Sequence, residues 1–102
     1  MSYYYVVDVH VTDHEQMADY SRQVGDVVRR YGGLYLARSP NVTAIEGDWH
    51  PTFIAILEFP DSAAYQRFHD SADYAPLKAI RTRSATAKVI GIEGLPAESV
   101  QA

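Results

Sequence analysis

The sequence predicts an α+β fold in which a four-stranded antiparallel sheet carries its helices on one side. Three observations support this prediction. Residues 3–11 are rich in Tyr and Val and have the two-residue period of a strand. The next segment repeats apolar residues every three or four positions, as an amphipathic helix does, and ends at a glycine pair. The second half of the chain repeats the order of strand, helix and strand.

The first strand is expected over residues 3–11. Side chains alternate between the two faces of a strand, so Asp8 and His10 share one face while the Tyr and Val residues at odd-numbered positions share the other. A helix is expected over residues 14–31, because a Thr-Asp pair can cap its start and the glycine pair can end it. Its apolar stripe consists of Met17, Tyr20, Val24, Val27, Val28 and Tyr31.

The second strand is expected over residues 34–38, with an interruption at Ser39-Pro40-Asn41 and a resumed extended segment over residues 42–46. Together these segments predict a bulged or bent strand. A turn follows at residues 47–51. Residues 53–59 then form the third strand, whose near-continuous apolar character indicates burial on both faces.

A second helix is expected after the third strand, capped by Asp61 or Ser62, and a further helical turn follows a break at residues 71–73. Residues 87–93 form the fourth strand. The resulting order of strand, helix, strand, strand, helix and strand is the ferredoxin-like βαββαβ arrangement, with both helices on one side of the sheet.

The third strand also predicts an assembly. An antiparallel sheet that is covered on one side should present polar residues on its open face, whereas this strand is apolar at both parities. A second copy of the sheet is the simplest cover, because a two-fold dimer would bury both open faces in a barrel-like core. We therefore expect a homodimer formed through the sheet faces, a dimeric α/β-barrel.

The composition narrows the possible functions. A chain of 102 residues is expected to form one domain, here residues 1–94, followed by a flexible tail at residues 95–102. The absence of cysteine excludes disulfides, thiolate catalysis and cysteine-ligated metal. The net charge of −4 argues against binding to nucleic acid or to an anionic membrane.

Neither a signal peptide nor a membrane span is expected. The chain enters a strand pattern at its start and contains no apolar run of the roughly eighteen residues that a membrane span requires. We expect a soluble, cytoplasmic protein. The histidines at positions 10, 14, 50 and 69 lack the paired spacing of zinc motifs, so neither a metal nor another cofactor is expected.

Five short motifs, taken in order along the chain, resemble the family known as domain of unknown function 1330. Each motif is weak alone, but the five in this order are jointly specific. They are Tyr31-Gly32-Gly33, Leu36-Ala37-Arg38, Glu46-Gly47-Asp48-Trp49, Glu58-Phe59-Pro60 and Tyr74-Ala75-Pro76-Leu77-Lys78-Ala79-Ile80-Arg81. The resemblance covers about residues 3–94 and implies the fold of the dimeric α/β-barrel superfamily.

The superfamily that this resemblance implies includes cofactor-independent monooxygenases, polyketide cyclases, lactone isomerases, aldoxime dehydratases and haem-dependent peroxidases. Its fold therefore does not select a reaction. The sequence departs from the family at one place, because a glycine pair usually follows the second-strand arginine, whereas Ser39-Pro40-Asn41 follows Arg38 here. Pro40 fixes a backbone angle and removes a donor, so a loop function is not carried over from the family.

Asp8 and His10 form the first candidate catalytic group. Their spacing points both side chains the same way, which would allow the acid to orient the imidazole as a general acid/base pair. The alternative is that His10 lies in solvent near the strand end while Asp8 makes a structural hydrogen bond. The sequence alone favours this structural alternative.

Arg38 and Arg81 form the second candidate group. A guanidinium presents a planar fork of donors, so either arginine could anchor a carboxylate, a phenolate or an enolate. The alternative is a structural network in which both arginines pair with Glu46 and Glu58 across the sheet, because buried charges need partners.

Aromatic residues are the candidates for the walls of a pocket. The chain has eight tyrosines, and most are expected to be core residues whose hydroxyl reaches a partner. A pocket between helices and sheet would suit a flat apolar ligand with one or two polar groups. The expected wall residues are Tyr20, Trp49, Phe68 and Tyr74.

Two functional interpretations follow. In the first, a dimeric protein acts without a cofactor on a small organic acid, enol or phenol by proton transfer. In the second, the protein is a non-catalytic module for small-molecule binding or assembly, and its charges set the register between subunits. An open cavity with an unpaired charged group directed inward favours the first interpretation, and a fully packed interface with paired charges favours the second.

Overall fold

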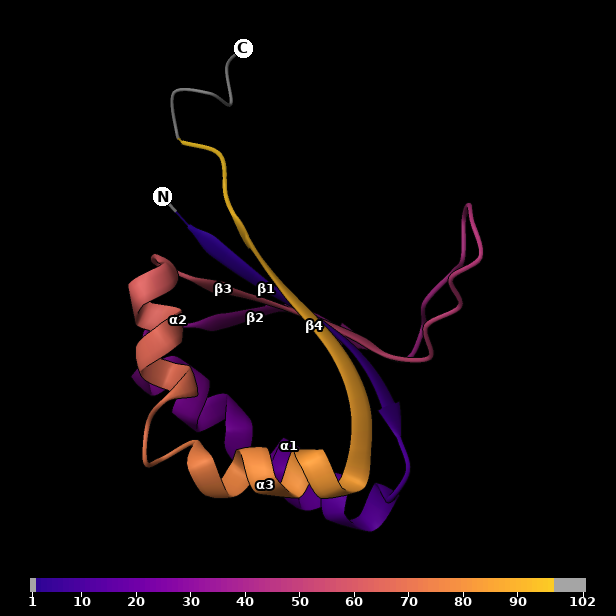
Figure 1. Cartoon of the computed structure of the whole chain (residues 1–102), viewed down its shortest axis with the longest axis horizontal. Coiled ribbons are helices and arrows are strands. Elements are labelled where there is room, and N and C mark those ends of the chain that lie inside the picture. The colour runs from indigo at the N-terminus through magenta and orange to yellow at the C-terminus, as the bar shows by residue number, and fades with distance from the viewer. Residues whose placement is uncertain (1, 97–102) are drawn as a thin grey trace.

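Four strands form one antiparallel sheet in the computed structural model, which describes residues 2–96 (Figure 1). The sheet has the order β2-β3-β1-β4. Its strands are β1 (Tyr3–Val11), β2 (Leu34–Ser39), β3 (Ile54–Phe59) and β4 (Ala85–Glu93). The helices are α1 (His14–Arg30), α2 (Ser62–His69) and α3 (Ala75–Ser84). The predicted ferredoxin-like βαββαβ order is therefore confirmed.

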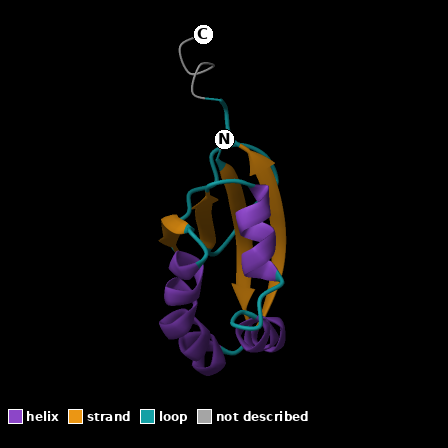
Figure 2. Ribbon diagram, turned by 90° about the vertical axis from the view of Figure 1, so that its left-hand side faces the viewer, coloured by secondary structure: helices purple, strands orange, loops and turns teal. Residues whose placement is uncertain are grey.

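The helices lie on one side of the sheet, which faces the viewer in Figure 2. The second helical region is two helices, because Ser71 makes two local hydrogen bonds that separate α2 from α3. Its hydroxyl donates to the carbonyl oxygen of Phe68 at 2.8 Å and accepts from the backbone N–H of Tyr74 at 3.0 Å. None of the helices within residues 2–96 is long and apolar enough to cross a membrane.

Residues 42–46 do not form the predicted continuation of β2. The strand ends at Ser39, and its one irregularity in register lies between Tyr35 and Ala37. Pro40 has no N–H to donate to a strand ladder, so the chain leaves the sheet there. Residues 40–53, here called the arm, project beyond the sheet before β3 begins (Figure 1). The tail predicted over residues 95–102 lies mostly outside the described residues, since residues 97–102 are not among them.

Local signals explain where the helices begin and end. The carboxylate of Asp13 caps α1 by accepting from the backbone N–H of Gln16 at 3.2 Å, and Asp61 caps α2 by accepting from the N–H of Ala64 at 2.8 Å. Gly32 adopts a φ of 87° after the last turn of α1, a conformation that glycine adopts without a steric penalty. Each boundary of the sequence prediction falls within two residues of the structure at these points.

The main core lies between the helices and the sheet. Its buried residues come from one face of β1 and β3 and from the apolar stripes of the helices. The largest of them are Tyr74, Phe59, Phe68, Val24 and Val28. The opposite face of the sheet, here called the open face, is also apolar: it carries Tyr4, Val6, Ile54, Ile56, Ile90 and Ile92. Ile90 is 63% exposed there, so residues 2–96 leave this face uncovered.

Candidate functional site

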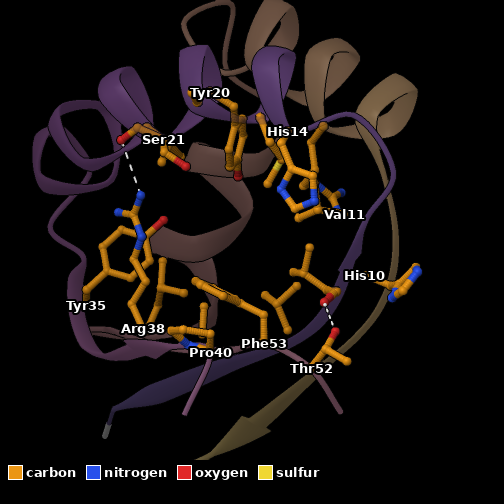
Figure 3. A pocket seen from close by; sticks show the side chains of 18 of the residues that line it. His10, Val11, His14, Tyr20, Ser21, Tyr35, Arg38, Pro40, Thr52 and Phe53 are labelled. Carbon is orange, nitrogen blue, oxygen red and sulfur yellow. Dashed lines mark hydrogen bonds between the residues drawn. The ribbon is translucent and has the colours of Figure 1, made fainter. Parts of the chain in front are cut away.

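A cavity of about 600 Å³ lies between α1 and the helix-covered face of the sheet. The first half of α1 lines one side, and the odd-numbered residues of β1 line the other. β2, β3 and the two ends of the arm also line it, with the exposed Arg38, Pro40 and Thr52 at its mouth (Figure 3). Phe68 from α2 and Arg81 from α3 complete the wall. Such a volume suits a small organic ligand.

The side chains of α1 explain why space remains here. The second half of the helix packs on the sheet through Val24, Val27 and Val28, all of which are buried. Nearer its start, the helix instead presents Ala18 and Ser21 toward the sheet. These side chains are too small to fill the interval between helix and strands, so the cavity opens where they lie.

Arg81 provides the main polar group of the cavity wall. Its Nε atom is buried and has no hydrogen-bond partner among residues 2–96, and no carboxylate within that range forms an ion pair with its guanidinium. Burial by itself lowers the pKa of Arg81, but attraction to any negative charge on Tyr74, Tyr5 and Tyr20 raises it by more, so the net pKa is raised. The group therefore remains a cation.

Tyrosine hydroxyls surround this cation. The hydroxyls of Tyr20 and Tyr74 lie 3.3 Å apart and share a hydrogen bond. Burial is the main cause that raises the pKa of Tyr5, Tyr20 and Tyr35 above the ordinary phenol value of 10.0. These tyrosines are consequently neutral at physiological pH and serve as hydrogen-bond donors or acceptors.

Arg38 is a second cation, at the mouth of the cavity. Its guanidinium donates to the carbonyl oxygen of Ser21 at 3.3 Å and lies 4.8 Å from the centre of the Tyr35 ring (Figure 3). The predicted ion-pair network with Glu46 and Glu58 is wrong. Glu46 lies on the exposed arm, and the alternation of side chains along β3 directs Glu58 to the open face.

Asp8 and His10 do not form an acid/base pair inside the cavity. Because side chains alternate along β1, Asp8 faces the open face, where it accepts a hydrogen bond from Trp49 Nε1 at 2.8 Å. His10 borders the cavity, but its ring points away from it (Figure 3). Trp49 is 56% exposed and is not among the residues that line the cavity.

The other expected wall residues lie at or next to the cavity. Tyr20 and Phe68 line it, and Tyr74 is buried directly behind Tyr20 through their shared hydrogen bond. Arg38 and Arg81 both line it as well. The structure thus brings together five of the eight sequence candidates, places His10 at the border of the cavity with its ring directed away, and separates Asp8 and Trp49 from them.

His14 is the functional candidate that sequence reasoning missed. It is the first residue of α1, and its ring points toward the cavity (Figure 3). A histidine at the start of a helix is commonly solvated, which is why its position alone gave no signal. The informative pattern is its helical spacing to Met17, Ala18 and Ser21, which all line the same side of the cavity.

The cavity combines an apolar body with an unbalanced positive charge. No Asp or Glu side chain is among the described residues that line it, although two arginines are. Within residues 2–96, no group of three His, Asp or Glu side chains is placed to hold a metal ion. The arrangement favours an organic anion as the occupant.

The family model for domain of unknown function DUF1330 matches residues 2–95. The chain belongs to the DUF1330 family. No curated protein matches the sequence of this DUF1330 chain. Its family and its fold are thus both known, and neither assigns it a reaction.

Solved structures with the same fold share little sequence with this DUF1330 chain. A protein of unknown function from Rhodopseudomonas palustris is 20% identical, with 93% of this chain and 83% of that chain covered and a TM-score of 0.77. A dimeric ferredoxin-like protein of unknown function from Jannaschia sp. CCS1 is 12% identical, with 92% and 100% covered and a TM-score of 0.77. SnoaB, a cofactor-independent oxygenase from Streptomyces nogalater, is 14% identical, with 94% and 93% covered and a TM-score of 0.59.

Proposed function

We propose that this DUF1330 protein binds a small organic acid, enol or phenol as its anion in the cavity and moves a proton on it without a cofactor. One observation carries the proposal: Arg81 holds a buried Nε–H without a partner in the wall of an apolar cavity. A buried donor on a cation that has no acceptor is unfavourable by several kcal/mol in general. A ligand carboxylate, enolate or phenolate oxygen would supply the acceptor.

The cavity also favours the neutral part of such a ligand. Val7, Val9, Phe53 and Leu57 offer apolar contact, and the ring of Tyr20 offers a flat surface. Arg38 at the mouth offers a second set of N–H donors for a further oxygen of the ligand. A flat ligand with an acidic group and one more polar group fits this distribution.

His14 is the proposed proton carrier, in place of Asp8 and His10. Imidazole is the side chain that most readily accepts and releases a proton near neutral pH. In the proposed step, His14 takes a proton from a carbon or hydroxyl of the ligand, the electron pair moves onto the adjacent oxygen, and Arg81 stabilises the resulting oxyanion. The exposed His14 exchanges this proton with solvent water and then returns a proton to a carbon or oxygen of the ligand, so the net change is at most an isomerisation and no oxidant is needed.

The fold is compatible with this chemistry. SnoaB, which shares the fold, is a cofactor-independent oxygenase. At 14% identity that likeness concerns the fold alone, so it supports the absence of a cofactor as part of the proposal and says nothing of the substrate.

A non-catalytic binding protein is the second candidate function. It is favoured by the exposure of His14, which leaves the imidazole open to solvent, whereas the anion anchor Arg81 is partly buried. Binding requires Arg81 and the apolar walls but does not require His14. Replacing the two residues separately therefore distinguishes the two functions.

We also propose that the protein is a homodimer formed through its open faces. Ile90 and Ile92 are more than half exposed in the single chain, and a second copy would remove both from water. The Jannaschia protein with this fold is dimeric, which supports the proposal.

The test compares the wild type with Arg81→Gln, His14→Gln and the matched control Arg67→Gln, which removes an exposed arginine of α2. Binding of 2-naphthoate, a fluorescent planar carboxylate, is measured by anisotropy. Proton transfer is measured by NMR as deuterium exchange at C3 of phenylpyruvate in D₂O. We expect Arg81→Gln to weaken 2-naphthoate binding by about tenfold or more, as the loss of a charge-assisted hydrogen bond implies.

His14→Gln should retain 2-naphthoate binding and lose the protein-dependent exchange, and Arg67→Gln should leave both unchanged. Equal affinity in the wild type and Arg81→Gln would contradict the anion anchor. Retained exchange in His14→Gln would remove the proposed proton carrier, and the absence of exchange in the wild type would favour the binding protein for this class of acid. Melting temperatures show that each variant is folded.

A further inference from the structure

We propose that the arm clasps a second copy of this chain, and that this docking fixes the mouth of the ligand cavity. The inference rests on the proposed dimer and the proposed ligand site. It goes beyond them because it makes the affinity of each cavity for its ligand depend on formation of the dimer.

The arm is a long apolar and acidic projection with little support from its own chain. No residue from 40 to 53 is part of a strand, and Phe53 at the end of the arm accepts one backbone hydrogen bond from β1. Ile45 near its tip is 92% exposed, and the arm projects clear of the sheet and helices in Figure 1. Removing an isoleucine side chain from water is favourable, and the described residues of this chain offer Ile45 almost no surface to pack against.

The arm is attached on the open-face side of the sheet. Its one side-chain hydrogen bond to a strand side chain within residues 2–96 joins Trp49 Nε1 to Asp8, which faces the open face. Asp8 lies opposite Ile54 on β3 and Lys88 on β4. A second subunit that covers the open face would therefore also contact the arm.

A second copy of the chain matches what the arm presents. Trp49 and Ile45 of the arm are exposed, as Ile90 and Ile92 of the open face are, and Trp49 is tied to that face through Asp8, so a partner on the open face could cover both sets. The charged side chains of the arm are Glu46, Asp48 and His50, while the open face carries the exposed Lys88 together with Asp8 and Glu58. In a two-fold dimer each arm would reach the other subunit, where Lys88 is the group that can pair with an arm carboxylate, once for each arm.

The two ends of the arm form part of the cavity mouth. Pro40, Thr52 and Phe53 line the cavity. The backbone N–H of Val9 donates to the carbonyl oxygen of Phe53 at 3.0 Å, and the Thr52 hydroxyl lies 3.5 Å from the carbonyl oxygen of Val9 (Figure 3). In the proposed dimer, docking of the arm holds these mouth residues in one arrangement and so favours ligand binding.

The test uses Ile45→Asp, a change at an almost fully exposed side chain that leaves the subunit fold intact. Ala72→Asp, in the exposed turn between α2 and α3, is the charge-matched control. The dimer dissociation constant is measured by sedimentation, and 2-naphthoate affinity by anisotropy at protein concentrations below and above that constant. A third variant, Trp49→Phe, keeps an aromatic side chain but has no N–H to donate to Asp8.

We expect Ile45→Asp to raise the dimer dissociation constant at least tenfold, Trp49→Phe to raise it less, and Ala72→Asp to leave it unchanged. Affinity for 2-naphthoate should fall at least threefold in the dissociated variant and recover at protein concentrations that restore the dimer. An unchanged dissociation constant in Ile45→Asp would overturn the clasp. Full affinity in dissociated subunits would overturn the coupling.

These outcomes are separate from those of the proposed function. A wild type that dimerises but does not bind 2-naphthoate contradicts the proposed ligand class, and the clasp then stands or falls on the dissociation constants alone. A wild type that remains monomeric at all concentrations contradicts both the proposed dimer and the clasp.

Discussion

At the scale of single residues, the cavity depends on a balance between the buried arginine and the phenols around it. Arg81 remains charged, while Tyr5 and Tyr20 remain neutral because burial raises their pKa. Neutral phenols orient their hydroxyls toward a cation but do not cancel its charge. The cavity therefore keeps a net positive potential that only an anion from outside neutralises.

The raised phenol pKa values predict a specific alkaline transition. A group whose folded pKa exceeds its unfolded value stabilises the folded state below the unfolded pKa, and this stabilisation is lost as the pH rises above it. The unfolded pKa of tyrosine is about 10. We expect Tyr5 and Tyr20 to ionise only as the protein unfolds above that pH, which absorbance at 295 nm and circular dichroism would report as coincident steps.

Tyr20→Phe supplies the control for that titration. The variant removes one of the two buried tyrosines that are expected to ionise only on unfolding, and it leaves the exposed tyrosines unchanged. A titration in which all tyrosines ionise reversibly near pH 10, while the circular dichroism stays native, would contradict the burial of these groups.

At the scale of elements, the junction between α1 and β2 controls how closely the helix approaches the sheet. Gly33 lies between Val28 of α1 and Phe59 of β3, and a Cβ atom built there would fall 2.7 Å from the Phe59 ring. No other residue fits this position without displacing buried side chains. The glycine pair thus ends the helix and also permits its close packing on β3.

A pair of glycine substitutions tests this packing. Gly33→Ala should lower the free energy of unfolding by about 1–3 kcal/mol, because overpacking a filled core forces side chains aside. Gly25→Ala, in the middle of α1, should raise it by about 0.5–1 kcal/mol, because a Cβ meets nothing closer than 3.5 Å there and alanine is the better helix former. Urea unfolding measures both, and equal effects at the two sites would refute the argument.

Much of the element-level structure was predictable from sequence. The alternation along β1, the stripe of α1 and the caps Asp13 and Asp61 are local signals, and the structure follows them. The prediction of a strand over residues 42–46 was wrong. An extended sequence pattern shows that a segment can form a strand, but it does not show that a neighbouring strand is available to pair with it. The edge position of β2 supplies no second neighbour there.

The site was less predictable than the fold, for a different reason. The type and spacing of Asp8 and His10 suggested chemistry, but the alternation of β1 directs them away from the cavity. The cavity itself arises where Ala18 and Ser21 face the strands, which depends on how deeply α1 packs. His14 becomes a candidate only once that placement is known.

At the scale of the whole molecule, one sheet serves two different surfaces. Its helix-covered face holds the core and the cavity, whereas its open face is largely apolar and is not covered by any of the described residues. An apolar sheet face of this kind is expected to become an interface. Ligand binding and assembly are thus assigned to opposite sides of the same strands, and β1 contributes to both.

Ile90→Lys tests the open-face dimer. The side chain is 63% exposed in the single chain, so the change should leave the subunit melting temperature nearly unaltered. Burying two symmetry-related lysines in the interface should raise the dimer dissociation constant by roughly 30-fold or more, since an unpaired buried charge is unfavourable by about 2 kcal/mol or more. Sedimentation equilibrium measures the constant, with Ala79→Lys on the exposed side of α3 as control.

The arm also has a consequence for how this family can vary. Its ends are fixed by the pairing of Ser39 with Ile54, so its length enters the stability of the subunit only through the entropy of closing a loop. That entropy grows with the logarithm of length, and doubling a loop costs only about 0.6 kcal/mol. Insertions and deletions in the arm are therefore nearly neutral for the subunit fold. Arm length can therefore change how far the arm reaches across a neighbouring subunit without a large change in the stability of the sheet.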